Sequence, residues 1–154
     1  MHSGLHIRVS LAGQTLELRD GETLLRRYPV STSKFGVGTE EGSYKTPLGT
    51  FRICEKYGDE APIHTVFRSR EPVEEWDPAL PCEEDLVLAR ILRLDGLEPE
   101  NSNSYQRFIY IHGTNHEELI GTPASHGCVR MRNQHVVELY DLVPIDTSVI
   151  ISAD

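Results

Sequence analysis

Short stretches in which apolar and polar residues alternate constrain the fold of this sequence more than any other feature. Residues 5–11 and 15–19 alternate in this way, which is the pattern of half-buried strands. Asp20-Gly21 follows them and is typical of tight hairpins. Further strands are expected at residues 24–30, 51–54, 85–94, 107–112 and 147–152. The pattern therefore predicts a fold made mainly of β-strands.

One segment, residues 133–143, has helical spacing of its apolar residues instead. Asn133 is the expected N-cap of this helix, and Pro144 prevents its continuation. At 154 residues the chain has the size of one domain, which can bury a core without disulfides. We therefore expect a single domain over residues 1–154, mainly β but mixed α+β, with one main helix.

Residues 58–84 show little periodicity and contain four prolines and two acidic groups. We expect a long loop with one helical turn near Trp76. Long loops in compact domains often serve as lids or binding loops, so this segment is a candidate lid.

The chain carries 15 basic and 24 acidic residues, a formal net charge of −9. Nucleic acids and anionic membranes both require a basic surface, so neither is expected as a partner. No apolar run approaches the roughly 18 residues of a spanning helix. The first six residues lack a basic start followed by an apolar stretch, which favours a cytoplasmic location. A periplasmic location is the alternative if a leader was removed.

Three cysteines, an odd number without a close pairing motif, do not indicate a disulfide framework. Cys54 lies in a strand-like run and is expected to be a small core residue. Cys82 lies in an acidic loop, where a free thiol without function is the simplest interpretation. A disulfide between these two residues is the alternative.

The third cysteine, Cys128, falls in a short region with two histidines, His112 and His126. An imidazole can take the proton of a thiol and hold the thiolate as an ion pair. Gly127 allows the backbone to turn and a substrate carbonyl to approach closely. The region therefore predicts that Cys128 is a nucleophile and His112 its base.

Three other roles for Cys128 are a buried structural residue, a redox sensor and a zinc ligand. A zinc site would need His112, His126 and either His116 or His135 as further ligands. Their spacings lack the tight pairs of usual zinc sites, so no metal and no cofactor are expected.

The segments that carry this chemistry resemble the signature of the YkuD family, the L,D-transpeptidases. They are His112-Gly113-Thr114, Ser125-His126-Gly127-Cys128-Val129-Arg130-Met131 and the upstream Thr46-Pro47-Leu48-Gly49-Thr50-Phe51. The similarity runs from about Gln14 to the C-terminus. It implies a β-sandwich-like fold with the main helix packed by the cysteine loop. Many members have Asn at the position of Arg130, so this difference bears on substrate contacts.

The resemblance also implies roles for single residues. The backbone carbonyl of Gly113 would orient His112, and the N–H groups of His126, Gly127 and Cys128 would hold the oxyanion. Ser125 would brace the loop, and His126 would support it.

Two arginines are candidates for binding a substrate carboxylate. Arg130 either grips that carboxylate or forms a structural ion pair. Arg90 interrupts an otherwise apolar strand face, so its guanidinium needs a carboxylate partner from the protein or from the substrate.

The substrate that the resemblance implies is a peptidoglycan tetrapeptide stem or muropeptide, cleaved between an L-centre and D-Ala. With a cytoplasmic location, water is the expected acceptor, which would make the protein an L,D-carboxypeptidase of peptidoglycan recycling. An L,D-transpeptidase that forms cross-links with an amine acceptor is the alternative. An inactive peptidoglycan-binding module is an alternative of another class. A carbapenem is expected to acylate Cys128.

Overall fold

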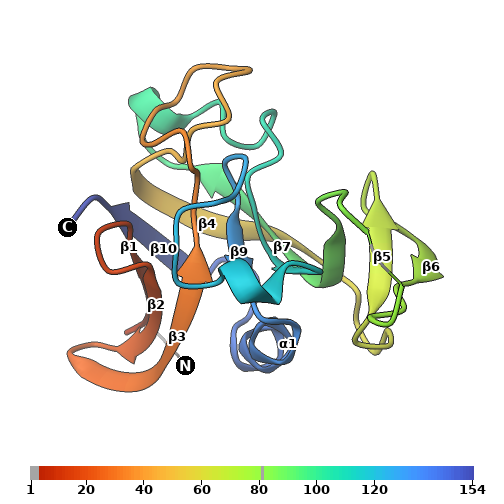
Figure 1. Ribbon diagram of the computed structural model, residues 1–154. Coiled ribbons are helices and arrows are strands. Elements are labelled where there is room, and N and C mark those ends of the chain that lie inside the picture. Colours follow the sequence, from red (N-terminus) through yellow and green to blue (C-terminus); the bar gives the residue numbers. More distant parts are fainter. Residues whose placement is uncertain (1–3, 81) are drawn as a thin grey trace.

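The computed structural model describes residues 4–80 and 82–154 as a strand-rich domain with one α-helix (Figure 1). Its strands are β1 (Leu5–Ser10), β2 (Thr15–Asp20), β3 (Thr23–Ser31), β4 (Gly49–Tyr57), β5 (Thr65–Arg68), β6 (Glu71–Glu75), β7 (Val87–Gly96), β8 (Tyr110–Thr114), β9 (Val129–Met131) and β10 (Ser148–Ser152). Helix α1 (Asn133–Leu142) follows β9 almost directly, and the short 3₁₀ helices η1 (Pro99–Asn101) and η2 (Glu117–Leu119) lie in loops. The predicted mainly β fold with one main helix after the cysteine loop is confirmed.

The strands form one sheet that closes on itself. Their order is β4-β10-β1-β2-β3-β9-β8-β7-β5-β6, and β4 pairs again with β7. The hairpin β5–β6 therefore projects beside the closed part of the sheet (Figure 1). The pairs β1–β10 and β8–β9 are parallel. A parallel neighbour needs a crossover connection, and residues 115–128, which contain the cysteine loop, form the connection from β8 to β9.

The core lies inside this closed sheet because alternate side chains of its strands point inward. Ile7, Val9, Leu16 and Leu18 show this alternation in β1 and β2, and each is at most 1% exposed. Helix α1 packs on β7 and β8 through a buried stripe that includes Leu139. The helix thus packs against β8, the strand that carries His112, and against its neighbour β7.

Residues 58–84 are not the irregular loop that their prolines suggested, because they contain the hairpin β5–β6. Pro72 is tolerated there because β6 pairs only with β5 and lies at the border of the sheet, where a missing N–H leaves no broken ladder. Trp76 follows β6, and its backbone N–H donates to the carbonyl of His64 at 2.8 Å. The helical turn expected there was therefore wrong. Pro81, in the same segment, lies outside the described residues. The lid role remains a prediction.

The start of α1 also differs from expectation, since Arg132 and not Asn133 is the N-cap. The side chain of Asn133 instead accepts the N–H of Thr114 at 2.9 Å and donates to the carbonyl of Thr114 at 3.0 Å. The Glu117 carboxylate accepts the N–H of Asn133 at 2.8 Å. A Cβ on Gly113 would lie 2.2 Å from Asn133 Oδ1, so only glycine permits this contact. The side chain of Asn133 thus binds the backbone at the end of β8 instead of capping its own helix.

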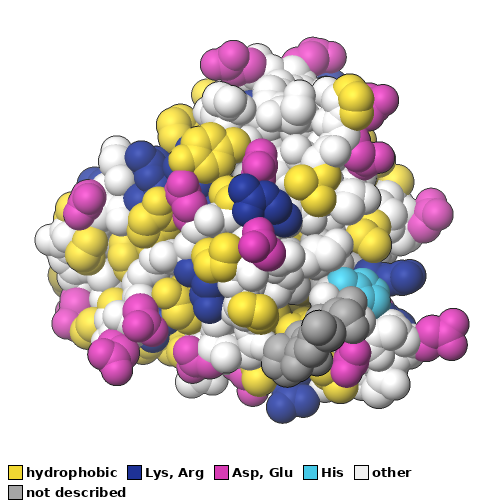
Figure 2. All heavy atoms as spheres, turned by 180° about the vertical axis from the view of Figure 1, so that it is seen from behind, with side chains coloured by type: hydrophobic (Ala, Val, Ile, Leu, Met, Phe, Trp, Pro, Cys, Tyr) yellow, Lys and Arg dark blue, Asp and Glu magenta, His cyan; other side chains and the backbone are white. Residues whose placement is uncertain are grey.

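Figure 2 shows one face of the domain, where charged side chains lie among apolar and other side chains. On this face Asp and Glu side chains are scattered, with basic side chains between them. Cys54, Cys82 and Cys128 are all free, so the alternative disulfide between the first two is not formed. In the described part of the chain, no helix has the length and apolar character needed to cross a membrane.

Candidate active site

The parallel pairing of β8 and β9 brings the two signature segments together. His112 is the register partner of Arg130, so both side chains point to the same face of the sheet. Cys128 directly precedes β9, two residues before Arg130, and its sulfur accepts the N–H of Tyr110, two residues before His112. The structure thus places the predicted nucleophile beside the strand that carries the predicted base.

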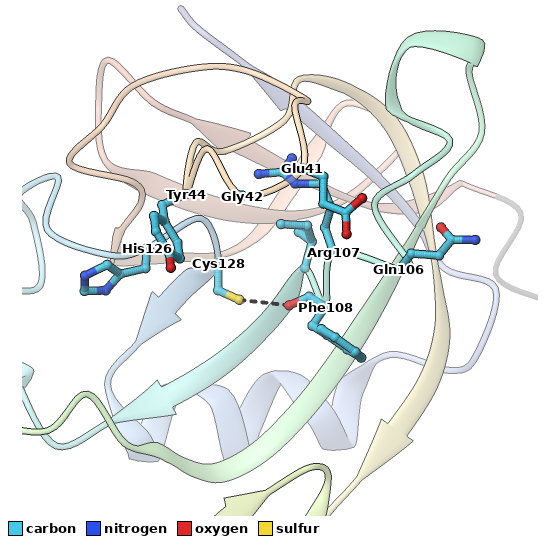
Figure 3. Close-up of a pocket in the computed structure, with 9 residues that line it drawn as sticks. Glu41, Gly42, Tyr44, Gln106, Arg107, Phe108, His126 and Cys128 are labelled. Carbon is cyan, nitrogen blue, oxygen red and sulfur yellow. Dashed lines mark hydrogen bonds between the residues drawn. The ribbon is translucent and has the colours of Figure 1, made fainter.

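The sulfur of Cys128 is held by the backbone that leads into β8. It accepts the N–H of Tyr110 at 3.3 Å, and its thiol donates to the carbonyl of Phe108 at 3.3 Å (Figure 3). Within the described residues, these two groups rather than the imidazole of His112 are its hydrogen-bond partners. A proton transfer between Cys128 and His112 therefore requires the thiol to rotate away from Phe108.

The His112 side chain is buried, with 3% of its surface exposed. Its Nδ1 lies 2.5 Å from the carbonyl oxygen of Gly113. A carbonyl can only accept a hydrogen bond, so Nδ1 carries the proton and Nε2 has a free lone pair. This is the contact that the resemblance implied for Gly113, and it leaves a nitrogen able to act as a base.

The protonation states of the pair differ from the sequence expectation. Desolvation raises the pKa of Cys128 to about 11, although the N–H of Tyr110 acts in the opposite direction. Burial also lowers the pKa of His112, against the opposing effect of Asp85. At neutral pH the resting pair is therefore a thiol and a neutral imidazole. The expected preformed ion pair is disfavoured because both of its charges would be desolvated.

Alkylation tests this protonation state. Only the thiolate reacts, and below the pKa its fraction rises tenfold per pH unit. We expect the rate of Cys128 modification by iodoacetamide to keep rising through pH 10, toward a midpoint near the pKa of about 11. Mass spectrometry of peptides from the wild type and from Cys128→Ala separates this rate from those of Cys54 and Cys82. A plateau already reached near pH 7 would show a preformed thiolate and contradict the assignment.

Side chains from distant segments brace the cysteine loop. Ser125 Oγ donates to the carbonyl of Cys128 at 2.7 Å and accepts the N–H of Gly127 at 3.3 Å. Thr46 Oγ1, in the upstream Thr-Pro-Leu-Gly segment, donates to the carbonyl of Gly127 at 3.0 Å. Gly127 has a φ of +119°, in the region that favours glycine. The upstream segment thus adjoins the site, where it fixes the turn before the cysteine.

Asp85 is the site residue that sequence reasoning missed. Its Oδ1 pairs with Arg130 Nη1 at 2.9 Å, and its Oδ2 lies 3.5 Å from Nδ1 of His126. Burial alone would raise the pKa of Asp85, but its electrostatic interactions with His112 and Arg130 and the hydrogen bonds from His126 and Arg130 together lower that pKa. From the sequence it was placed only at the start of the strand expected at residues 85–94. The available signal was that it is the last of three acidic residues, directly before an apolar strand, in a chain with an arginine two residues after the cysteine.

The two arginines proposed to bind substrate are both buried. Arg130 is 2% exposed and forms the structural ion pair with Asp85, one of its two predicted alternatives. Arg90 donates instead to the carbonyls of Ala61 at 2.9 Å and Ala89 at 2.7 Å. The protein carboxylate expected for Arg90 was therefore wrong: its partners are backbone carbonyls, and that of Ala89 lies at the bulge in β7. A substrate carboxylate as partner of Arg90 remains a prediction.

A cavity of about 270 Å³ lies beside Cys128. Its lining comes from the loop before β4, the segment before β8 and the cysteine loop (Figure 3): Glu41, Gly42, Tyr44, Gln106, Arg107, Phe108, Ile109, His126 and Cys128. Tyr44 and Phe108 have φ values of +59° and +56°, a strained region for aromatic residues that clusters at functional sites. The sulfur thus has a built opening beside it that can receive an acyl group.

Across residues 4–80 and 82–154, no group of three or more His, Cys, Asp or Glu side chains is placed to hold a metal ion. The zinc alternative for Cys128 therefore finds no ligand set there.

Known proteins are similar to this chain in sequence or in structure. The model of the L,D-transpeptidase catalytic domain YkuD matches residues 4–151. YqjB of Bacillus subtilis (strain 168) is 48% identical over 120 residues, which cover 78% of this chain and 59% of YqjB.

Solved structures share the fold at lower identity. An L,D-transpeptidase from Xylanimonas cellulosilytica has a TM-score of 0.64 at 20% identity, covering 99% of this chain and 62% of that one. The L,D-transpeptidase LdtMt1 in complex with imipenem has a TM-score of 0.61 at 19% identity, covering 97% and 59%. This chain thus spans about three-fifths of the length of each of these proteins. Because the family model matches nearly all of the described residues, the chain belongs to the YkuD family of L,D-transpeptidase catalytic domains.

Proposed function

We propose that the protein is a cysteine-dependent acyltransferase that acts on the L–D peptide bond of peptidoglycan tetrapeptide stems and releases D-Ala. The observation that carries this proposal is the position of Cys128: its sulfur adjoins a cavity and binds the backbone of β8, the strand that also carries His112 with its free Nε2. Membership of the YkuD family supports the choice of substrate.

The chemistry starts from the neutral pair. As the sulfur attacks the carbonyl carbon, Nε2 of His112 takes the thiol proton, and the buried imidazolium gains the nearby Asp85 carboxylate as a counter-charge. The N–H groups of His126 and Cys128 stabilise the oxyanion, together with that of Gly127 once it leaves Ser125 Oγ. His112 then gives the proton to the departing amine of D-Ala, and a thioester with Cys128 remains.

Water is the acceptor that we propose for this thioester. The cavity of about 270 Å³ is smaller than the roughly 300–1,000 Å³ of typical ligand sites. One stem fills such a cavity more readily than two, and hydrolysis needs no second peptide site. Attack by water gives a tripeptide stem and regenerates the thiol, which is L,D-carboxypeptidase activity. The second candidate is an amine of another stem, favoured because solved structures of the same fold carry the name L,D-transpeptidase.

Incubation with a disaccharide tetrapeptide tests the proposal, with the products identified by mass spectrometry. We expect a tripeptide stem and free D-Ala. A stem with L-Ala at its fourth position is the matched control and should remain intact. Cross-linked dimers would transfer the assignment to the amine acceptor. If the tetrapeptide binds but is not cleaved, the binding-module alternative replaces the enzyme.

Acylation by a carbapenem is a second expectation of the same proposal. A solved structure with this fold is a complex with imipenem. A β-lactam carbonyl is an acyl donor, so attack by Cys128 would open the ring and leave a thioester on the sulfur.

A further inference from the structure

Four arginines of the domain differ in how far oxygens of the protein already bind their guanidinium groups. Arg130 is buried against Asp85, and Arg90 is bound to backbone carbonyls. Arg107 lines the cavity, but its guanidinium donates to the carbonyls of Lys45 at 2.7 Å and Gly38 at 3.2 Å. These three arginines therefore serve the protein's own oxygens.

Arg70 differs from them. Its Nη1 donates to the hydroxyl of Tyr110 at 3.0 Å, and its guanidinium lies 5.3 Å from the centre of the Phe108 ring. Tyr110 and Phe108 are also the residues whose backbone groups hold the sulfur of Cys128. Within the described residues, no carboxylate forms an ion pair with Arg70, although the chain has a net charge of −9.

The backbone fixes Arg70 in this position. Arg68 of β5 is the register partner of Glu71 of β6, so Ser69 and Arg70 form the two-residue turn of the hairpin. Their φ values are +49° and +67°, both in the left-handed region that such turns usually fill with Asn or Gly. Two non-glycine residues in this region carry a conformational cost, and such strain clusters where a side chain has a function. The turn directs Arg70 to Tyr110, whereas Arg68 pairs with Glu84 at 3.0 Å.

We propose that Arg70 binds a free carboxylate of the donor stem and so determines substrate specificity; this inference rests on the proposed function. A guanidinium binds a carboxylate through two parallel hydrogen bonds. Within the described residues, only Nη1 of Arg70 donates to Tyr110, so its other nitrogens can donate to a carboxylate. The Phe108 ring, whose centre lies 5.3 Å from the guanidinium, helps to hold the guanidinium in place through a cation–π contact. A tetrapeptide stem offers the carboxylate of its terminal D-Ala and, where the diamino acid carries one, a side-chain carboxylate.

Steady-state kinetics of Arg70→Gln against wild type test the assignment with three donors. One is the tetrapeptide, the second has its terminal carboxylate amidated, and the third has its side-chain carboxylate amidated. We expect Arg70→Gln to raise KM for the tetrapeptide about tenfold with kcat within about twofold, since a charged hydrogen-bonded pair is lost. One amidated donor should show the same loss with wild type and no further loss with Arg70→Gln, which identifies the carboxylate. Arg70→Lys should retain part of the affinity.

Arg68→Gln is the matched control, because this arginine lies on the same hairpin but pairs with Glu84. It should leave all three KM values unchanged. Equal losses on every donor, or the same losses in Arg68→Gln, would overturn the role of Arg70. If wild type cleaves no donor, the proposed function fails instead. Calorimetric binding of the three stems to Cys128→Ser, with and without Arg70→Gln, then still decides whether Arg70 recognises the carboxylate.

Discussion

Replacing Cys128 by serine is expected to lower kcat/KM for the tetrapeptide by about ten-thousand-fold or more, as removal of the catalytic nucleophile does in serine proteases. The hydroxyl of serine is a much weaker acid than a thiol, and His112 is a weak base because burial lowers its pKa. The imidazole therefore cannot activate serine as it does cysteine. Release of D-Ala, followed by mass spectrometry, measures the loss.

The same variant tests the carbapenem expectation. Imipenem should add its mass to the wild type and not to Cys128→Ser. The single variants Cys54→Ser and Cys82→Ser are the controls, since both thiols are free but lie outside the cavity lining. They should keep activity and the adduct. Substantial D-Ala release by a folded Cys128→Ser variant would refute the nucleophile assignment.

Replacing Asp85 by alanine is expected to lower the free energy of unfolding by about 3 kcal/mol, because it strands a buried cation. Arg130 is 2% exposed, and its Nε and Nη2 have no partners within the described residues. Asp85 supplies the charge that compensates this guanidinium. Urea unfolding of wild type and variant, followed by circular dichroism, measures the difference.

Two further variants separate this effect from the general loss of a carboxylate. Glu84→Ala removes the partner of Arg68, a pair in which both side chains are about half exposed and screened by solvent, so stability should change little. Asp85→Ala combined with Arg130→Met removes both charges, and it should be more stable than Asp85→Ala alone. An Asp85→Ala variant as stable as Glu84→Ala would show that Arg130 does not depend on Asp85.

The sequence was most informative where local pattern and final structure agree. Alternation located β1 and β2, the Asp20-Gly21 hairpin signal led to β3, and the single helical stripe located α1. The signature residues pointed to Cys128 and His112, and the parallel pairing of β8 with β9 explains why segments 16 positions apart meet. Each of these features depends on residues close together in the chain, or on a motif that already combines them.

The misses concern tertiary partners. Pro72 argued against a strand because its place at the border of the sheet was not visible from the sequence. Asn133 was predicted to be a helix cap because the sequence does not show that the backbone groups of Thr114 lie beside it. The carboxylate next to Arg130 comes from Asp85, 45 positions earlier. Cys128 keeps its proton at neutral pH because desolvation raises its pKa, and a local sequence pattern does not show how far a side chain is desolvated.

The border strand β6 has a consequence for self-association. It reads Glu71-Pro72-Val73-Glu74-Glu75, it is exposed throughout, and it pairs on one side only, with β5. Three like charges and a proline make this border a poor template for a strand from a second molecule. The hairpin that carries Arg70 can therefore stay uncovered beside the cysteine without seeding aggregates, even at high protein concentration.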